Sequence, residues 1–295
     1  MTRSDLDPHA ILHTLGLTEA TAITPVHGGS DTAIWQVEQA KAVYALRVFG
    51  EGEHSDCERE QMVMQAALVA GLPVPQVHAA GTWHDHPALL LSWLPGRPVA
   101  EELRVHPWRA WKLGVAFGHM HASIHALPAP GIFHGQLDGW IDWLGPDERS
   151  LQQCLRTMDH RCDALLHLDY HPWNVLTDGK SITGVLDWRN ARAGDPRADA
   201  ARTVAILRID YIGKRPIREI IGRRVFEQGW RSGYEQKGAP LRDLPLFYAW
   251  AGAVMEQDLA PKRAPEDLAR IHQWTMRWKR HASGKGTVVT LSDSA

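Results

Sequence analysis

The sequence predicts an α+β fold in which a small antiparallel β-sheet with one main helix precedes a larger, mostly helical part. Short runs rich in Val, Ile, Tyr and Trp, with near-alternating polarity, occupy most of residues 1–95 and are typical of strands. Beyond them the apolar residues recur mainly with the spacing of helices. We therefore expect an N-terminal lobe at residues 1–95 and a helical C-terminal lobe at residues 96–295.

The N-terminal elements follow one another with short connections. In order they are a helix at 5–16, strands at 23–29, 32–38 and 42–50, a helix at 55–70, and strands at 76–83 and 87–94. Ser55 or Asp56 is expected to cap the longer helix, because such side chains accept hydrogen bonds from the first free N–H groups. Gly71 is expected to end it, since glycine readily adopts the left-handed conformation found after helices.

The C-terminal part begins after the loop LPGRP at residues 94–98, and a hinge near Trp93–Gly96 is expected to join the two lobes. Its predicted helices lie at about 107–127, 138–164, 197–212, 215–236, 242–258 and 265–281. Residues 165–188 interrupt this pattern and are predicted to form two short strands around a turn at Thr177–Lys180.

The composition is that of an ordinary soluble globular protein. The 295 residues carry a formal net charge of -2, with 44% hydrophobic and 22% charged residues. This balance indicates neither a nucleic-acid nor a membrane partner, and no apolar run reaches the roughly 18 residues of a membrane span. The 3 cysteines lack CxxC spacing, and the N-terminus lacks the apolar run of a signal peptide, so we expect a cytoplasmic protein.

One segment in the middle of the chain carries the clearest chemical pattern. His167 and Asp169 are followed by Asn174, and Asp187 lies inside the apolar run at 184–188. Phosphoryl transfer needs a carboxylate that orients a hydroxyl and accepts its proton, and oxygen ligands that hold Mg²⁺. Asp169 and Asn174 share one loop, and the predicted hairpin returns the chain beside it. A carboxylate in an apolar setting needs a cation or donors, which favours a metal site over an ordinary turn.

This segment resembles the catalytic region of the aminoglycoside phosphotransferase and choline kinase-like family, distant relatives of the protein kinases. HLDYHPWNVL at residues 167–176 is similar to the family's catalytic loop, and VLDWRNARAGDPRADAA at 185–201 to its metal-binding segment. The resemblance extends from about residue 23 to 210 and is looser outside 165–201. Leu168 stands where the family often has glycine, so the turn there is expected to be shaped differently.

Carried over by position, the resemblance implies one role for each polar residue of the segment. Asp169 would be the catalytic base, and Asn174 and Asp187 would be the Mg²⁺ ligands. His167 and Asp199 would support the loop from behind. The resemblance also implies a protein-kinase-like, two-lobed fold with the nucleotide bound in the cleft between the lobes.

A turn in the N-terminal lobe is expected to contact the triphosphate. Gly28, Gly29 and Ser30 lie between two predicted strands, where glycine lets backbone N–H groups approach phosphate oxygens. An ordinary Gly-Gly hairpin turn is the alternative interpretation. The position of this turn, before two strands and a basic residue, favours phosphate binding.

The basic residue that follows is Arg47, which stands where the kinase fold has its phosphate-contacting Lys. A guanidinium can grip the α- and β-phosphates through parallel hydrogen bonds. Glu60 on the next helix is its expected ion-pair partner, and Glu58 is the alternative. The adenine edge is expected to meet backbone groups near the hinge, namely those of Ser92, Trp93 and Leu94.

These features predict a Mg²⁺-dependent kinase that transfers the γ-phosphoryl group of ATP to a hydroxyl of a small metabolite or antibiotic. GTP is an alternative donor, because backbone contacts decide between the two. A nucleotide-binding pseudokinase or regulatory module is the alternative outside catalysis. The presence of Asp169, Asn174 and Asp187 together argues against that alternative.

Three histidines on one predicted helix could suggest a metal site. His121 and His125 have i, i+4 spacing and His119 lies close by, but no carboxylate interrupts them as in the zinc-binding HExxH pattern. We interpret them as surface or packing residues.

The charge of the C-terminal helices bears on the acceptor. Between residues 200 and 281, 16 Lys and Arg residues stand against 9 Asp and Glu residues. A polycationic aminoglycoside needs carboxylates to replace the water around its ammonium groups. The balance therefore favours a neutral, zwitterionic or anionic acceptor, and we expect kanamycin-type compounds to be poor substrates.

Overall fold

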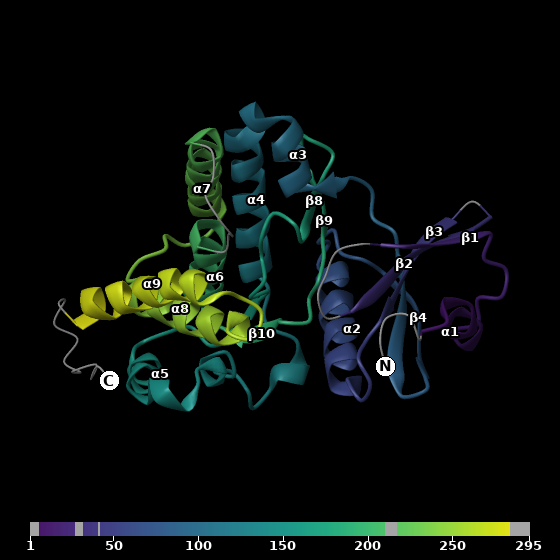
Figure 1. Ribbon diagram of the computed structural model, residues 1–295, viewed down its shortest axis with the longest axis horizontal. Coiled ribbons are helices and arrows are strands. Elements are labelled where there is room, and N and C mark those ends of the chain that lie inside the picture. Colours follow the sequence, from purple (N-terminus) through teal and green to yellow (C-terminus); the bar gives the residue numbers. More distant parts are fainter. Residues whose placement is uncertain (1–5, 27–31, 41, 210–216, 284–295) are drawn as a thin grey trace. The chain divides into compact units, whose positions relative to one another are not determined.

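The computed structural model describes residues 6–26, 32–40, 42–209 and 217–283 (Figure 1). The chain divides into two compact units. Unit 1 runs to Gly96 and also includes Thr183–Arg189, and unit 2 contains the rest. Unit 1 holds a five-stranded antiparallel sheet with one long helix, whereas unit 2 is mostly helical. The predicted α+β fold class is confirmed.

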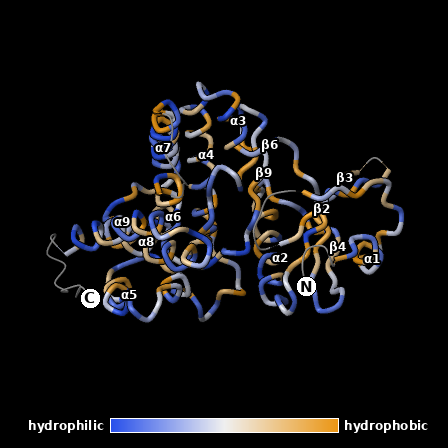
Figure 2. Tube along the Cα trace, in the orientation of Figure 1, coloured by the Kyte–Doolittle hydropathy of each residue, from blue (hydrophilic) through white to orange (hydrophobic). Residues whose placement is uncertain are grey.

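The sheet of unit 1 has the strand order β1-β2-β3-β5-β4. Its strands are β1 (Ala22–Pro25), β2 (Ala33–Gln39), β3 (Ala42–Val48), β4 (Val77–Trp83) and β5 (His86–Ser92). The short helix α1 (Pro8–Thr14) packs on β4 and buries Ile11 and Leu12 against Val37 and Leu46 of the sheet. Apolar residues are concentrated around β2 in Figure 2, which marks this core.

The long helix of unit 1 is α2 (His54–Val69), which contacts β4 and β5. The prediction of Ser55 or Asp56 as its N-cap is wrong, because the helix begins one residue earlier and its N-cap is Glu53. The carboxylate of Glu53 makes no cap hydrogen bond and accepts a backbone N–H of the preceding turn. The predicted end is confirmed, since Gly71 has φ +82° immediately after the helix.

The helices of unit 2 are α3 (Val99–Val105), α4 (Ala110–His125), α5 (Arg149–Thr157), α6 (Pro196–Ile209), α7 (Ile217–Lys237), α8 (Pro245–Leu259) and α9 (Pro265–Ser283). Helix α3 is absent from the prediction. The continuous helix expected at 138–164 is wrong, because only α5 and short 3₁₀ turns occur there and a strand begins at Ala164. Gly145 and Pro146 interrupt this stretch, and proline lacks the N–H that a continuous helix needs.

Short strands of unit 2 frame the segment that carries the predicted chemistry. They are β6 (Arg97–Pro98), β7 (Ala164–Leu166), β8 (Val175–Thr177) and β10 (Arg192–Gly194). Strand β9 (Ile182–Val185) follows β8 in the chain and belongs to unit 1 from Thr183 onward. Strand β7 pairs with β10, and β6 pairs with β8, both antiparallel. The predicted turn is confirmed, because the Asp178 carboxylate accepts the backbone N–H groups of Lys180 and Ser181 there.

Helices α4 and α7 lie side by side (Figure 1) and approach closely through glycine. Gly114 and Gly118 on α4 face Gly229 and Gly233 on α7. A Cβ added to Gly118 would lie 2.1 Å from the carbonyl oxygen of Trp230, so the two backbones leave no room for a side chain. Two GxxxG patterns in the sequence thus form the contact that brings α7 side chains against α4.

No helix in the described ranges has both the length and the apolar character that a membrane span requires.

Candidate active site

The loop between β7 and β8 brings the predicted base and the predicted metal ligand into contact. The Nδ2 of Asn174 donates to Oδ2 of Asp169 at 2.9 Å and to the Asp169 carbonyl oxygen at 3.1 Å. The loop is tightened further by the Asn174 backbone N–H, which donates to the His171 carbonyl at 2.9 Å. Since both amide hydrogens face Asp169, the amide oxygen Oδ1 is the atom of Asn174 that can bind a cation.

Asp169 is held in its ionised form. Burial raises the pKa of its carboxyl, but a hydrogen bond and charge from His171 and the charge of Arg202 outweigh this and lower the pKa below its usual value. The Nε2 of His171 lies 3.5 Å from Oδ2 of Asp169, whose side chain remains 25% exposed. A carboxylate that is both ionised and accessible can accept a proton from a bound hydroxyl.

The residue before Asp169 has an unusual backbone conformation. Leu168 has φ +60°, in the left-handed region that glycine adopts without strain. Its N–H donates to Oδ1 of Asp199 at 3.0 Å, and its carbonyl accepts from Nε of Arg202 at 3.0 Å. Leucine therefore keeps a glycine-like turn here, because hydrogen bonds on both sides of the residue hold it.

Asp199, on α6, anchors the start of the loop as a fully buried carboxylate. Besides Leu168 it accepts the backbone N–H of His167 at 2.6 Å. The His167 ring is also buried, and its Nδ1 accepts the backbone N–H of Asp169 at 3.2 Å. The two residues expected to support the loop thus both bind its backbone.

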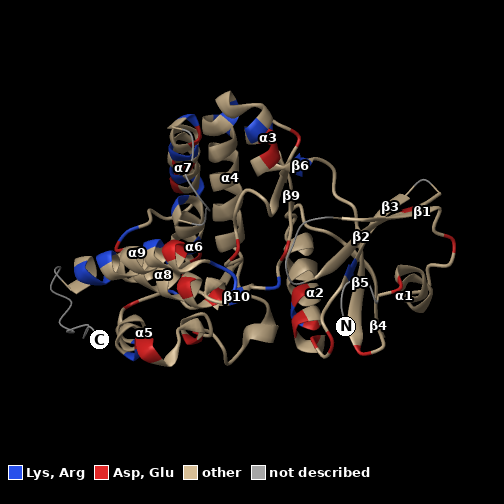
Figure 3. Ribbon diagram, viewed as in Figure 1, with Lys and Arg blue, Asp and Glu red and all other residues tan. Residues whose placement is uncertain are grey.

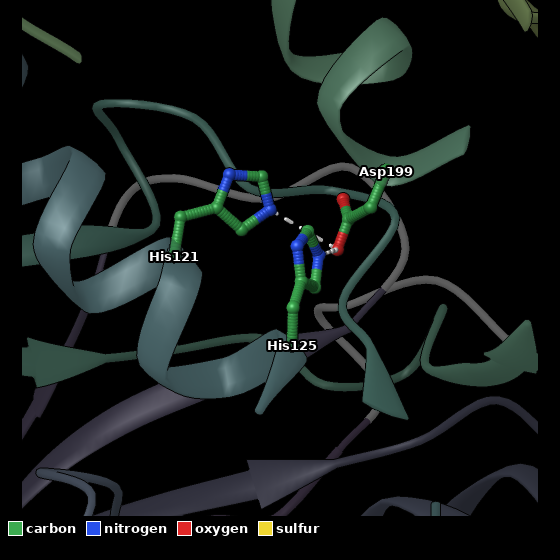
Figure 4. A group of neighbouring side chains, drawn as sticks. All are labelled: His121, His125 and Asp199. Atoms are coloured by element: carbon green, nitrogen blue, oxygen red, sulfur yellow. Dashed lines mark hydrogen bonds and ion pairs between the residues drawn. The ribbon is translucent and has the colours of Figure 1, made fainter. Parts of the chain in front are cut away.

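Two histidines of α4 complete the surroundings of Asp199 (Figure 4). The Nε2 atoms of His121 and His125 lie 3.2 and 3.1 Å from Oδ2 of Asp199. The indole N–H of Trp230 donates to Nδ1 of His121 at 3.3 Å, and Nδ1 of His125 lies 2.8 Å from the Tyr234 hydroxyl. Because Nδ1 of His121 accepts, its Nε2 carries the proton and lies beside the Asp199 carboxylate, although of the two rings only that of His125 forms a hydrogen bond with it, through Nε2. This arrangement satisfies a buried carboxylate without a metal ion.

Burial lowers the pKa of His121 to about 4, and the charge of His125 adds to this effect. His121 is therefore neutral near pH 7. Burial raises the pKa of Asp199, but the two neighbouring histidines, His121 and His125, outweigh this effect and hold the pKa well below its usual value. The sequence interpretation treated these histidines as surface or packing residues, although their i, i+4 spacing already placed them on one helix face.

Arg47, one of the residues predicted to contact phosphates, belongs to a cluster of charged side chains in unit 1. Arg47, on β3, lies 3.0 Å from Oε1 of Glu60 on α2 and 2.8 Å from Oδ1 of Asp187. The pairing of Arg47 with Glu60 decides between the two glutamates that the sequence left open. Burial lowers the pKa of Arg47, but the charges of Glu60 and Asp187 outweigh it and raise the pKa above its usual value.

Asp187 differs from its two partners in exposure. Its side chain is 39% exposed, whereas Arg47 and Glu60 are buried. Asp187 has φ +62°, and the next residue, Trp188, donates its backbone N–H to Glu60 at 3.2 Å. The chain around Asp187 is thus fixed on the buried glutamate while its carboxylate faces outward, and a hard cation can reach its oxygen atoms.

The remaining predicted nucleotide contacts have different outcomes. Gly28, Gly29 and Ser30 lie outside the described residues. The backbone N–H of Ser92 donates to the Gln76 carbonyl at 2.9 Å, and that of Trp93 to the Val43 carbonyl at 3.2 Å. These two N–H groups are therefore already paired within unit 1. The adenine contact that remains predicted is to the backbone of Leu94 and to the carbonyl groups of Ser92 and Trp93.

Two cavities adjoin the loop between β7 and β8 within unit 2. A cavity of about 120 Å³ is lined by Asp169, Arg202, Asp258 and apolar residues. A larger cavity of about 600 Å³ lies against α3, α6 and α7. Both are lined by His171 and Ile206, so the two cavities are neighbours. Open space therefore adjoins the Asp169 side chain.

The sequence matches the model of the phosphotransferase enzyme family at residues 22–164 and 147–235. The chain belongs to the phosphotransferase enzyme family. Among curated proteins, no sequence matches this chain. Membership of this family confirms the resemblance seen in the catalytic segment.

Solved structures of phosphotransferases have the same fold. A thermostable mutant of aminoglycoside phosphotransferase APH(4)-Ia, in ternary complex with AMP-PNP and hygromycin B, is 17% identical, with TM-score 0.61, 93% of this chain and 97% of that chain covered. ADP-bound aminoglycoside phosphotransferase APH(2'')-Ib is 13% identical, with TM-score 0.60 and coverage of 92% and 99%. A putative fructosamine-3-kinase from Haemophilus somnus 129PT is 12% identical, with TM-score 0.60 and coverage of 91% and 95%. These similarities confirm the predicted protein-kinase-like fold.

Proposed function

We propose that this phosphotransferase is a small-molecule kinase that uses Mg²⁺ and ATP to phosphorylate a hydroxyl group. The observation that carries the proposal is the contact between Asp169 and Asn174 in a loop anchored by buried Asp199. Direct phosphoryl transfer needs an ionised carboxylate, an oxygen ligand for a metal ion and space for the acceptor. Asp169 supplies the carboxylate, the Asn174 amide oxygen is not used in the contact with Asp169, and a cavity adjoins Asp169.

In the proposed reaction the acceptor hydroxyl binds in the smaller cavity and donates a hydrogen bond to Asp169. The acceptor oxygen forms a bond to the γ-phosphorus while the bond from that phosphorus to the bridging oxygen of ADP breaks. The hydroxyl proton passes to the Asp169 carboxylate, and ADP leaves. Asp169 is accessible and ionised before the reaction, as a base at this position requires.

Asn174 and Asp187 are the proposed ligands of Mg²⁺. Their oxygen atoms match the preference of this hard cation, and the Asn174 amide is oriented by its two hydrogen bonds to Asp169. When bound, the ion would neutralise charge on the β- and γ-phosphates. Asp187 is already paired with Arg47, so its carboxylate is held in place by a fixed positive charge.

Arg47 is the proposed contact to the α- and β-phosphates, and Glu60 positions it. The ion pair is buried, so both groups are fixed before a nucleotide binds. Gly28, Gly29, Ser30 and the hinge backbone remain predicted contacts to the phosphates and the adenine. Relatives with bound AMP-PNP or ADP support an adenine nucleotide over GTP.

The proposal is tested by measuring Mg²⁺- and acceptor-dependent ADP release over a panel of hydroxylated metabolites, with ATP and GTP in parallel. Asp169→Asn should lower kcat by roughly 10²–10⁴, the usual contribution of a general base, with little change in Mg²⁺–ATP affinity. Near-normal turnover of this variant would rule out the proposed base. A wild-type protein that binds Mg²⁺–ATP but phosphorylates nothing would point to the pseudokinase alternative.

A further inference from the structure

The larger cavity of unit 2 has an apolar wall beside the catalytic loop. This wall is formed by Leu103 of α3, Pro172 of the loop, Ile206 of α6 and Phe226 of α7. Trp173, also of the loop, lines it with a side chain that is 56% exposed. A volume of about 600 Å³ falls within the range of small-molecule sites. An exposed indole on an apolar wall offers a flat surface to the organic part of a ligand.

The charged groups of this cavity are mostly arginines. Arg104 of α3 lines it together with Arg218 and Arg223 of α7, and Glu219 is the acidic residue among the described lining. Figure 3 shows the basic residues on α3 and α7. The Nε of Arg223 lies 3.7 Å from Oε1 of Glu219, so this carboxylate is balanced by one of the arginines. Arg104 and Arg218 have no ion pair with any described residue.

The smaller cavity has a different charge. Asp169 and Asp258 line it, and Arg202 pairs with Asp258 at 2.7 Å. The proposed base therefore lines one of two adjacent cavities, and the excess of positive charge lines the other. A ligand that spans both would place a hydroxyl at Asp169 and an anionic group at Arg104 and Arg218. A polycation would instead meet two uncompensated guanidinium groups, which is unfavourable.

We propose that the acceptor is a hydroxylated organic anion whose carboxylate or phosphate binds Arg104 and Arg218 while its apolar part lies on Trp173. This proposal rests on the proposed kinase function and adds the substrate class. Guanidinium groups bind both anions through paired hydrogen bonds, so the two share one recognition chemistry. The acceptor class thus differs from the aminoglycoside hygromycin B, which is bound in one of the similar structures.

The test is a binding screen in the presence of Mg²⁺ and AMP-PNP. The set contains equal numbers of hydroxylated carboxylates, phosphate monoesters, neutral amides and amines of matched size, such as phenyllactate, its amide and phenylalaninol. Thermal shift identifies binders, and calorimetry gives their Kd. We expect carboxylates or phosphate monoesters to predominate, and the ratio between these two arms identifies the anion. A predominance of amines or neutral compounds, or no binder at all, would overturn the proposal.

Matched charge-reversal variants then locate the site. Arg218→Glu and Arg104→Glu should each weaken binding of the best anion by about tenfold or more, roughly 1.4 kcal/mol. Arg224→Glu is the control, because Arg224 is exposed on the same helix and does not line the cavity. Equal affinities of Arg218→Glu and Arg224→Glu would overturn the proposed location.

Failure of this proposal can be told from failure of the kinase proposal. Mg²⁺–ATP binding is measured separately on the wild-type protein. If Mg²⁺–ATP binds and amines are phosphorylated, the kinase proposal stands and the anionic class is wrong. If anions bind through Arg218 but no phosphoryl transfer occurs with any of them, the cavity assignment stands and the kinase proposal is wrong.

Discussion

The buried carboxylate of Asp199 accepts the backbone N–H of Leu168 at 3.0 Å and so holds a leucine in a conformation that usually belongs to glycine. A left-handed backbone costs a non-glycine residue roughly 1–2 kcal/mol. The Leu168 side chain is fully buried, and a buried leucine stabilises a fold by more than this cost. Leucine therefore exchanges local strain for packing, directly before the residue proposed as base.

Substitutions at Leu168 should separate these two contributions. Leu168→Ala keeps the strain and loses the packing, so we expect it to lower the free energy of unfolding by about 3 kcal/mol. Leu168→Gly loses one further methyl group but relieves the strain, and on balance should be about 1 kcal/mol more stable than Leu168→Ala. Urea unfolding of both variants measures the difference. A glycine variant less stable than the alanine variant would contradict a strained turn.

The Asp187 carboxylate should contribute to nucleotide binding only when Mg²⁺ is present. Asp187→Ala removes the proposed metal ligand, and we expect Mg²⁺–ATP affinity to fall by about tenfold or more and turnover to be lost. Calorimetry with Mg²⁺–ATP and with ATP in EDTA provides the comparison. Equal losses in both titrations would show instead that the substitution acts through the Arg47 ion pair.

The sequence was sufficient for groups whose partners lie close in the chain or in a recognised motif. Asp169 and Asn174 are five residues apart, and their contact follows from one loop. The three-dimensional structure was needed to choose Glu60 over Glu58, because the direction of a helix residue depends on how the helix packs. No local pattern showed that His125 binds Asp199, which lies 74 residues away. The sequence likewise gave no sign that Arg202 donates to the Leu168 carbonyl, because the two residues lie 34 positions apart.

The predicted helix at 138–164 failed where local breaks mattered more than periodicity. Apolar residues such as Trp140 and Leu144 have an approximately helical spacing there. They are buried in the structure, but they lie on 3₁₀ turns and connecting loops and not on a continuous helix. Conversely, the GxxxG patterns of α4 and α7 were visible in the sequence. Glycine is a poor helix former in isolation. Its presence in α4 and α7 is explained by the close approach of the two helix backbones, which the sequence alone does not show.

The close contact of α4 and α7 should not tolerate a methyl group. Gly118→Ala would place a Cβ 2.1 Å from the Trp230 carbonyl oxygen, and two helix backbones must separate to accept it. Overpacking of this kind costs about 1–3 kcal/mol, and a larger loss is expected because backbone cannot change rotamer. Chemical denaturation gives the change in the free energy of unfolding.

Gly222→Ala provides the control on α7, since a Cβ there has no heavy atom within 4 Å. This substitution should stabilise the protein by about 0.5–1 kcal/mol, because alanine loses less backbone entropy in a helix. The two Gly-to-Ala substitutions should therefore have opposite signs. A neutral or stabilising Gly118→Ala would show that the two helices are not in backbone contact.

The neutral His121 ring should make stability depend on pH between about 4 and 6.5. Its pKa is about 4 in the folded protein and near 6.5 when unfolded, so acid favours the unfolded chain. Stability is therefore complete above pH 6.5 and is lost as the pH falls towards 4. The charged and titratable groups around the ring are Asp199, His125, His167, Tyr170 and Tyr234. Asp199, with a pKa well below 3.8, stays ionised throughout this range.

By linkage the loss from His121 alone between pH 7.5 and 5.0 is about 2 kcal/mol. His121→Gln removes the titration and leaves a neutral side chain whose amide oxygen can accept from Trp230. The variant should be less stable than wild type at pH 7.5, and its free energy of unfolding should fall by about 2 kcal/mol less on acidification. Urea titrations of both proteins at the two pH values measure this difference, which cancels the other titrating groups. Parallel pH profiles of the two proteins would contradict the prediction. They would show that His121 binds a proton equally well in the folded and unfolded chains, so that its Nδ1 does not remain an acceptor for the Trp230 N–H.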